Sequence, residues 1–309
     1  TKQLAPVALV VPGKMDETVH QEFIGLAHML IERHVLFRMI YEEDLNESVP
    51  DGVSAVVLPA GETDPRVLEK IGSFAQQGGR VLVCSSKIDE NMATLFGIRM
   101  DAEMLEANYV LAEKLDWDLG PVGLVNRPGI IRNWDGADVL MVASDGLVKG
   151  DVVEEFPPLN RSKQPVAISR QKGMGHITYF AAGLGSSYKT YPHPDYGRLM
   201  ERLLAMDDTE KIVLLDGPGT VQLTAFQKKG KLLVHLVNGS GSPSVEITPS
   251  LAAMTVRVPG QQVNETFMHM PTEEVATLTV TRSGNESSVI VPQLEAYGLL
   301  EINVATSRI

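Results

Sequence analysis

"KGMGHITYFAAGLGSSYKTYPHPDYGRLMERLL", residues 172–204, is the stretch of sequence that decides the fold. A hairpin through Gly173 leads into an apolar strand, a glycine-rich segment follows, and DYGRLMERLLAM has the apolar spacing of an amphipathic helix. His193, Pro194 and Asp195 stand in a row where the strand-like run gives way to the helix. A histidine beside an acid at such a junction is either a catalytic base with its orienting carboxylate or a turn with a helix cap.

Strand and helix patterns alternate through the first hundred residues. VALVV (7–11) is a continuous apolar run, as in strands covered on both faces, and DETVHQEFIGLAHMLIERH carries its apolar residues on one helical face. Further strands are predicted at 36–42, 53–61 and 80–86, and DPRVLEKIGSFAQQGG predicts a helix between the last two. This alternation predicts a parallel α/β sheet. Residues 101–136 have no such regularity.

From about Thr209 the pattern changes to alternation with period two. VQLTAFQKKGKLLVHLVNGSG, ATLTVTRSGNESSVIVP and YGLLEINVA read as strands joined by short turns. The sequence therefore predicts an α/β protein of two domains: a flavodoxin-like parallel sheet domain at 1–208, followed by a small all-β, antiparallel sandwich domain at 209–309.

Most of residues 7–206 resemble a class I glutamine amidotransferase. VVLPAG resembles that family's VLPGG strand, and YPHPDYGRL resembles its His-Pro-Glu junction. The Gly-x-Cys-x-Gly elbow of the family is missing, because VLVCSSKID has no glycine on either side of Cys84 and aligns Ser85 with the nucleophile. Small neighbours allow a nucleophile to stand in a strained turn, so we expect the Cys84 thiol to point into the core.

A second resemblance is closer and covers nearly the whole chain. Residues 172–204 resemble the end of a β-galactosidase trimerisation domain, and the last hundred residues resemble the β domain that closes those glycoside hydrolases. The resemblance implies a non-catalytic region of a glycoside hydrolase that serves in homo-oligomer assembly and in shaping a carbohydrate site. It also implies an upstream TIM-barrel catalytic domain, with Thr1 just after it. The His-Pro-Asp step is then a remnant, with Asp195 as helix cap.

Two groups of residues are candidates for carbohydrate contact. The first is the glycine-rich segment 183–193 at the end of a strand, whose amides and hydroxyls suit a sugar or an anion. An ordered loop without ligand is the ordinary alternative. The second is an aromatic platform, against the alternative of core anchors. The candidates are Ser186, Ser187, Tyr188, Lys189, Tyr191, His193 and Asp195 in the segment, and Trp117 and Trp134 in the platform.

Other features exclude several functions. The net charge of −12 argues against binding to nucleic acid or to anionic membranes, and no apolar run is long enough to span a bilayer. A single cysteine and the histidine spacing support neither a disulfide nor a metal site, and no cofactor motif is complete. The acids Glu42, Glu43 and Asp44 read as a solvated strand end.

The compartment is left open, with the cytoplasm favoured. No signal peptide is evident, whereas five Asn-x-Ser/Thr sequons allow secretion: Asn46, Asn160, Asn238, Asn264 and Asn285.

Two alternative functions remain. One is a stand-alone hydrolase of sugar metabolism that resembles the ThuA-like family, with its pocket above the strand ends 11–14, 42–44, 59–63 and 84–87. The other is a stand-alone carbohydrate-binding module that uses the two tryptophans.

Overall fold

The structure is a computed structural model that describes residues 1–59, 61–118, 120–145, 161–206, 211–240, 248–271 and 275–304. Backbone contacts divide the chain into two compact units. The α/β unit comprises residues 7–29 and 38–206, and the β unit comprises residues 1–6, 30–37 and 207–309. The α/β unit ends at residue 206, near the predicted domain boundary at 208/209. Residues 1–6 and 30–37, however, group with the C-terminal hundred residues. The two domains at 1–208 and 209–309 stay a prediction.

The α/β unit is built on a mixed sheet. Among the described residues, nine strands follow the order β3-β2-β4-β5-β12-β11-β10-β7-β8. The pairs β2–β4, β4–β5 and β5–β12 are parallel, and the pairs from β12 to β8 are antiparallel, so the sheet is only partly the parallel one predicted. The strands are β2 (Val7–Val11), β3 (Phe37–Tyr41), β4 (Ala55–Leu58), β5 (Arg80–Cys84), β7 (Ala107–Ala112), β8 (Val122–Gly123), β10 (Asp138–Asp145), β11 (Arg161–Lys172) and β12 (Gly175–Phe180).

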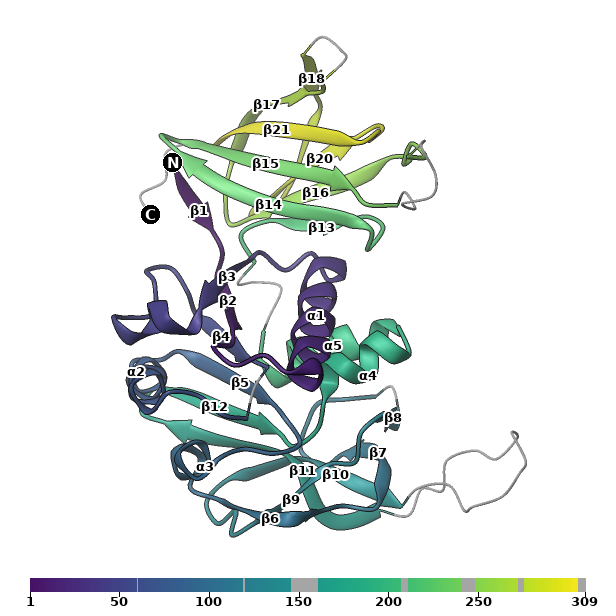
Figure 1. Cartoon of the computed structure of the whole chain (residues 1–309). Helices are drawn as coiled ribbons and strands as arrows, with labels where there is room; N and C mark the ends of the chain where they lie inside the picture. Colours follow the sequence, from purple (N-terminus) through teal and green to yellow (C-terminus); the bar gives the residue numbers. More distant parts are fainter. Residues whose placement is uncertain are drawn as a thin grey trace, which may run out of the picture. The chain divides into compact units, whose positions relative to one another are not determined.

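Helices cover both faces of this sheet (Figure 1). Side chains of α2 and α3 share one hydrophobic cluster with Ala8 and Val10 of β2, whereas α1, α4 and α5 lie together on the other face. The elements are α1 (Glu17–Glu32), the 3₁₀ helix η1 (Glu42–Asn46), α2 (Pro65–Gln76), α3 (Glu90–Phe96), α4 (Leu184–Thr190) and α5 (Pro194–Leu203). The stretch without predicted regularity contains β7, β8 and a two-stranded sheet of β6 (Arg99–Met104) and β9 (Gly129–Arg132).

The glycine-rich segment of the opening sequence forms α4, and a buried carboxylate holds its start. Both oxygens of Glu22, on α1, accept hydrogen bonds from backbone amides of α4: Gly185 at 2.7 Å and Ser186 at 2.8 Å. Burial raises the pKa of Glu22 to about 7, against the opposing effect of these hydrogen bonds. The first amides of α4 therefore have an internal acceptor that the sequence does not reveal.

Glycines allow α1 and α4 to meet backbone to backbone. A Cβ atom on Gly25 would lie 1.9 Å from the carbonyl oxygen of Gly185, and one on Gly185 would lie 2.1 Å from the carbonyl oxygen of Glu22. No side chain fits at either position. The glycines that suggest a ligand-binding loop are thus required by the packing of two helices.

The β unit consists of two antiparallel sheets. Among the described residues, one follows the order β1-β14-β15-β21-β17-β18 and the other β13-β16-β20-β19, and both contribute to one hydrophobic cluster. Its first strand, β1 (Lys2–Leu4), pairs with β14 (Figure 1). The others are β13 (Leu214–Asp216), β14 (Val221–Lys228), β15 (Lys231–Asn238), β16 (Met254–Pro259), β17 (Val263–His269), β18 (Ala276–Leu278), β19 (Val280–Ser283), β20 (Glu286–Val291) and β21 (Tyr297–Val304).

Within the β unit, His34 ties the segment 30–37 to the chain around β13. Nδ1 lies 3.0 Å from the carbonyl oxygen of Leu215, and Nε2 lies 3.1 Å from that of Pro218. Burial lowers the pKa of His34, so the neutral ring donates through one nitrogen at pH 7. The residue has a φ of 51°, in the left-handed region.

Substitution Glu22→Gln is expected to destabilise the chain by about 1–3 kcal/mol, because an amide has one acceptor oxygen for two buried donors. The raised pKa means that the folded state binds this proton more tightly than the unfolded state between pH 4.5 and 7. Its contribution to stability, on the order of 3 kcal/mol, is present below pH 4.5 and is lost as the pH rises to 7.

Urea unfolding at several pH values checks this expectation, with Glu17→Gln on the exposed side of α1 as the control. The loss in Glu22→Gln should be larger at pH 5 than at pH 7.5, and Glu17→Gln should follow the wild type. A loss that does not depend on pH would contradict the role of Glu22.

For His34→Ala, we expect a loss of about 2 kcal/mol in the free energy of unfolding, since a buried hydrogen bond disappears and alanine disfavours a positive φ. His34→Asn should lose less, because asparagine tolerates the left-handed region and its amide donates. Chemical denaturation measures both, with the exposed His20→Ala as control. If His34→Ala and His34→Asn are both as stable as the His20→Ala control, then His34 does not hold the segment 30–37 to the chain around β13.

Candidate functional site

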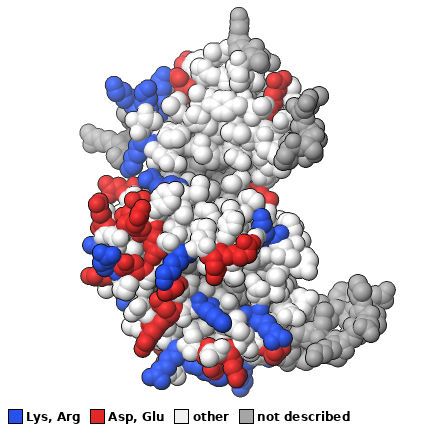
Figure 2. All heavy atoms as spheres, viewed as in Figure 1, with Lys and Arg blue, Asp and Glu red and all other residues white. Residues whose placement is uncertain are grey.

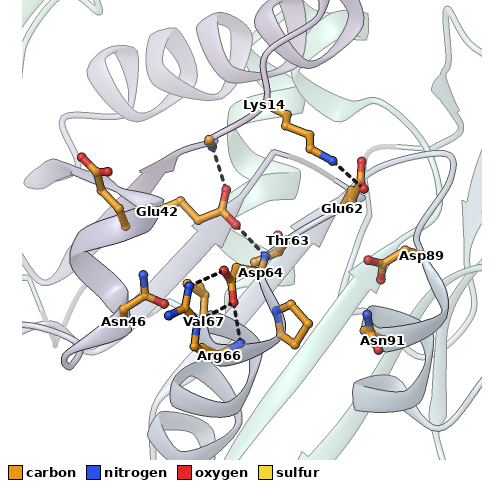
Figure 3. A pocket seen from close by; sticks show the side chains of 13 residues that line it. Lys14, Glu42, Asn46, Glu62, Thr63, Asp64, Arg66, Val67, Asp89 and Asn91 are labelled. Carbon is orange, nitrogen blue, oxygen red and sulfur yellow. Dashed lines mark hydrogen bonds and ion pairs between the residues drawn. The ribbon is translucent and has the colours of Figure 1, made fainter.

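A polar pocket of about 590 Å³ opens at the carboxyl ends of β2 and β4. Its walls come from residues 13–14 after β2, from η1 after β3, from residues 62–67 after β4 and from the start of α3 (Figure 3). In the strand order β3-β2-β4, β2 lies between the two strands that follow it in sequence. The chain therefore goes from β2 to β3 on one side and then to β4 on the other side of β2. Pockets of α/β proteins form at such a reversal of strand order, so the topology places this site.

Glu42 connects three of these walls. One carboxylate oxygen accepts a hydrogen bond from the amide of Gly13 at 2.7 Å, and the other accepts from the amide of Asp64 at 2.8 Å. Figure 3 shows the carboxylate between the two segments. Glu43 and Asp44 are exposed, as expected for a solvated strand end, but Glu42 fixes the mouth of the pocket. Figure 2 shows acidic side chains gathered over η1.

Two ion pairs line the same pocket. Nζ of Lys14 lies 2.8 Å from Glu62, and the guanidinium of Arg66 lies 3.0 Å from Asp64. The hydrogen bond with Glu62 raises the pKa of Lys14, and the hydrogen bond with Arg66 lowers the pKa of Asp64. Both pairs are exposed, so they contribute little to stability and present donors and acceptors at the surface of the pocket.

The start of α3 closes the remaining side. Asp89 caps the helix, with Oδ1 accepting from the amide of Met92 at 2.7 Å, and its own amide donates to the carbonyl oxygen of Gly61 at 2.7 Å. Asn91 lies two residues further on and is exposed at the pocket. Sequence analysis did not single out Lys14, Glu62 or Asn91. The available signal for Lys14 and Glu62 was that they lie in the strand ends 11–14 and 59–63 named for the hydrolase alternative, whereas Asn91 lies on α3, outside those ends.

Of the two residues near the position of the missing nucleophile, Cys84 is buried and Ser85 is partly exposed with its hydroxyl engaged. Cys84 ends β5 and is fully buried, and burial raises the pKa of its thiol well above the ordinary value, with a further contribution from Glu22. The hydroxyl of Ser85 donates to the carbonyl oxygen of Lys87 at 2.6 Å. A Cβ atom on Gly61 would lie 1.6 Å from that same oxygen, so the backbone after β4 covers this place.

His193 and Asp195 form a helix start. His193, and not Asp195 as expected, is the N-cap of α5: its Nδ1 accepts a hydrogen bond from the amide of Asp195 at 3.3 Å, and Pro194 takes the first position. The reason is that His193 has extended backbone angles, whereas Asp195 already lies in the first turn. The Asp195 carboxylate lies 3.3 Å from His193 and 3.4 Å from Arg198.

The other candidates of the segment divide into buried and exposed residues. Ser186, Ser187 and Tyr188 are buried in α4, where the hydroxyl of Ser187 donates to the carbonyl oxygen of Gly183 at 2.6 Å. Lys189 and Tyr191 are exposed. The exposed side chains of the segment therefore lie in its second half, while the amides of Gly185 and Ser186 donate to Glu22.

The two tryptophans lie in different surroundings. The indole nitrogen of Trp117 donates to the carbonyl oxygen of Gly120 at 2.8 Å, and the side chain is partly exposed. Trp134 packs against the core cluster of α2 and α3. Their geometry leaves the aromatic platform a prediction, with Trp134 closer to the core-anchor alternative.

Two further features bear on the predicted functions. Within the described ranges, no group of three or more His, Cys, Asp or Glu side chains is placed to hold a metal ion. Over the same ranges, none of the helices combines the length and apolarity that crossing a bilayer requires.

The asparagines of the sequons differ in exposure. Asn238 is buried and donates to the carbonyl oxygens of Pro249 and Glu295. Asn264 and Asn285 are exposed, and Asn160 lies outside the described residues.

Comparisons with sequences identify no relative: no protein-family model matches the chain, and no curated protein matches it. Solved structures do match. An α-L-fucosidase isoenzyme 2 from Paenibacillus thiaminolyticus is similar over 98% of this chain and 49% of its own, with a TM-score of 0.72 and 18% identity.

Two β-galactosidases are also similar. The enzyme from Bacillus circulans sp. alkalophilus matches 97% of this chain and 42% of its own, with a TM-score of 0.61 and 16% identity. A catalytic mutant of a GH42 β-galactosidase from G. stearothermophilus matches 99% and 41%, with a TM-score of 0.63 and 13% identity. The chain thus spans less than half the length of these enzymes. Its fold is one that occurs within glycoside hydrolases, which confirms at that level the resemblance expected from the sequence.

Proposed function

We propose that this chain is the non-catalytic region of a larger glycoside hydrolase, in which it serves oligomer assembly and the shaping of a carbohydrate site. The observation that carries the proposal is the burial of the only cysteine thiol, at the end of β5. The Cys84 thiol is buried, its pKa is raised, and the backbone at Gly61 lies over the neighbouring residues. A thiol reacts as its thiolate, so a buried thiol of raised pKa is a poor nucleophile.

The arrangement of the two units supports the proposal. The order of the parallel strands and the position of α5 fit a flavodoxin-like, amidotransferase-like domain that has lost its elbow. In the β unit, two antiparallel sheets share one hydrophobic cluster, as the sheets of a β-sandwich do. In each of the similar solved enzymes, more than half of the chain lies outside the part that matches this one. A parent protein of that length has room for an upstream TIM-barrel catalytic domain.

Carbohydrate contact is proposed for exposed groups only. Lys189, Tyr191 and His193 are exposed along and after α4, and Trp117 is partly exposed. No sugar contact is proposed for Ser186, Ser187 and Tyr188, because they are buried.

One observation favours a second candidate, the stand-alone hydrolase of sugar metabolism. The pocket includes residues of three of the four strand ends named for that function, 11–14, 42–44 and 59–63, and five carboxylates line it. Against it, both oxygens of Glu42 are occupied by backbone amides, and Asp64 is paired with Arg66. A general acid or base needs a free oxygen within reach of its substrate.

The purified chain is expected to hydrolyse neither nitrophenyl galactosides and fucosides nor glutamine above the uncatalysed rate, because the Cys84 thiol is buried and both oxygens of Glu42 are bound by backbone amides. Cys84→Ala should give the same result, and sedimentation should show self-association. Catalysis that is lost in Glu62→Gln or Asp89→Asn would favour the hydrolase instead. A chain that stays monomeric at all accessible concentrations would contradict the assembly role.

A further inference from the structure

The pocket at the ends of β2 and β4 is preformed. Glu42 holds the segments after β2 and β4 by two hydrogen bonds, and the amide of Asp89 holds Gly61. Hydrogen bonds between separate segments fix the walls before a ligand arrives, so less conformational entropy is lost on binding. The volume of about 590 Å³ lies in the range of small-molecule sites.

Hydrogen-bond donors and hydrogen-bond acceptors both line this pocket. The ammonium of Lys14 and the carboxylate of Glu62 stand side by side at 2.8 Å, which presents donors next to an acceptor. Asn91 adds an amide with donor and acceptor atoms on the opposite wall (Figure 3). Asp89 uses Oδ1 for the cap of α3. A hydroxyl group donates and accepts at once, so paired donors and acceptors suit it.

The charge of the lining restricts the ligand further. Five carboxylates and two cations give a formal charge of −3, which disfavours anions such as phosphate esters. Cationic ligands find few free acceptors, because Glu62 and Asp64 are paired with Lys14 and Arg66 and both oxygens of Glu42 are bound by backbone amides. A neutral ligand with many hydroxyl groups avoids both conflicts.

We propose that this pocket binds a neutral saccharide, with Lys14, Glu62 and Asn91 as hydrogen-bonding contacts and Glu42 as the residue that positions the walls. The proposal names a site for the carbohydrate role and in that sense rests on the proposed function. It adds a sugar site at the strand ends of the α/β unit, and none of the residues of the segment 183–193 or the tryptophans lines this pocket.

The test is titration of the isotope-labelled chain with D-galactose, L-fucose and lactose, followed by the NMR signals of backbone amides. The amides of Gly13, Asp64 and Asn91 are expected to shift in a saturable way with at least one of these sugars. Asn91→Ala should weaken that binding at least threefold, and Glu62→Gln about tenfold, because a hydrogen bond to a charged group contributes more. Thr94→Ala, one turn further on the exposed side of α3, is the matched control and should bind like the wild type.

Three outcomes would overturn the proposal. The first is no saturable shift with any of the sugars in a folded chain. The second is a preference for spermidine or for inorganic phosphate at the same amides. The third is a response at the indole signals of Trp117 or Trp134 with none at the pocket, in which case the carbohydrate role survives and this site does not. Glycosidase activity of the chain would refute the non-catalytic function without deciding where a sugar binds.

Discussion

The contact between α1 and α4 is the constraint on which the opening sequence depends. Glu22 gives both carboxylate oxygens to the amides of Gly185 and Ser186, and glycine at 25 and 185 lets the two backbones meet. Burying a carboxylate is costly unless its oxygens find donors, and the start of a helix supplies them. The same contact fixes the direction in which the chain leaves β12, and hence where α5 begins with His193.

The same carboxylate also affects the cysteine at the end of β5. The anion that the amides of α4 bind is part of the protein, and its charge adds to the burial that keeps the Cys84 thiol protonated. At the strand ends, by contrast, Glu42 braces the walls and leaves other polar side chains directed into open space. One part of the α/β unit is therefore filled by a side chain of the protein itself, whereas the pocket at the strand ends is open.

Local signals allowed much of the fold to be predicted. Asp64 caps α2 with Pro65 at its first position, Gly173 turns the β11–β12 hairpin with a φ of 62°, and the period-two tail forms antiparallel strands. Each of these features is decided by residues a few positions apart. The helix α4 was missed because glycine and serine are poor helix formers, and tertiary contacts with Glu22 outweigh that preference. The pocket could be located by strand ends, but the role of Glu42 depends on amides far away in sequence.

The pairing of β1 with β14 has a consequence for the order of folding. Lys2 lies opposite Gln227, so nearly the whole α/β unit separates two neighbouring strands of one sheet. During synthesis on the ribosome, the first strand emerges long before its partner exists, and closing so long a loop is entropically costly. The α/β unit can form in the meantime, because residues 7–29 and 38–206 contain its sheet. On this order of events, β1 pairs with its neighbour in the sheet only after β14 has been synthesised.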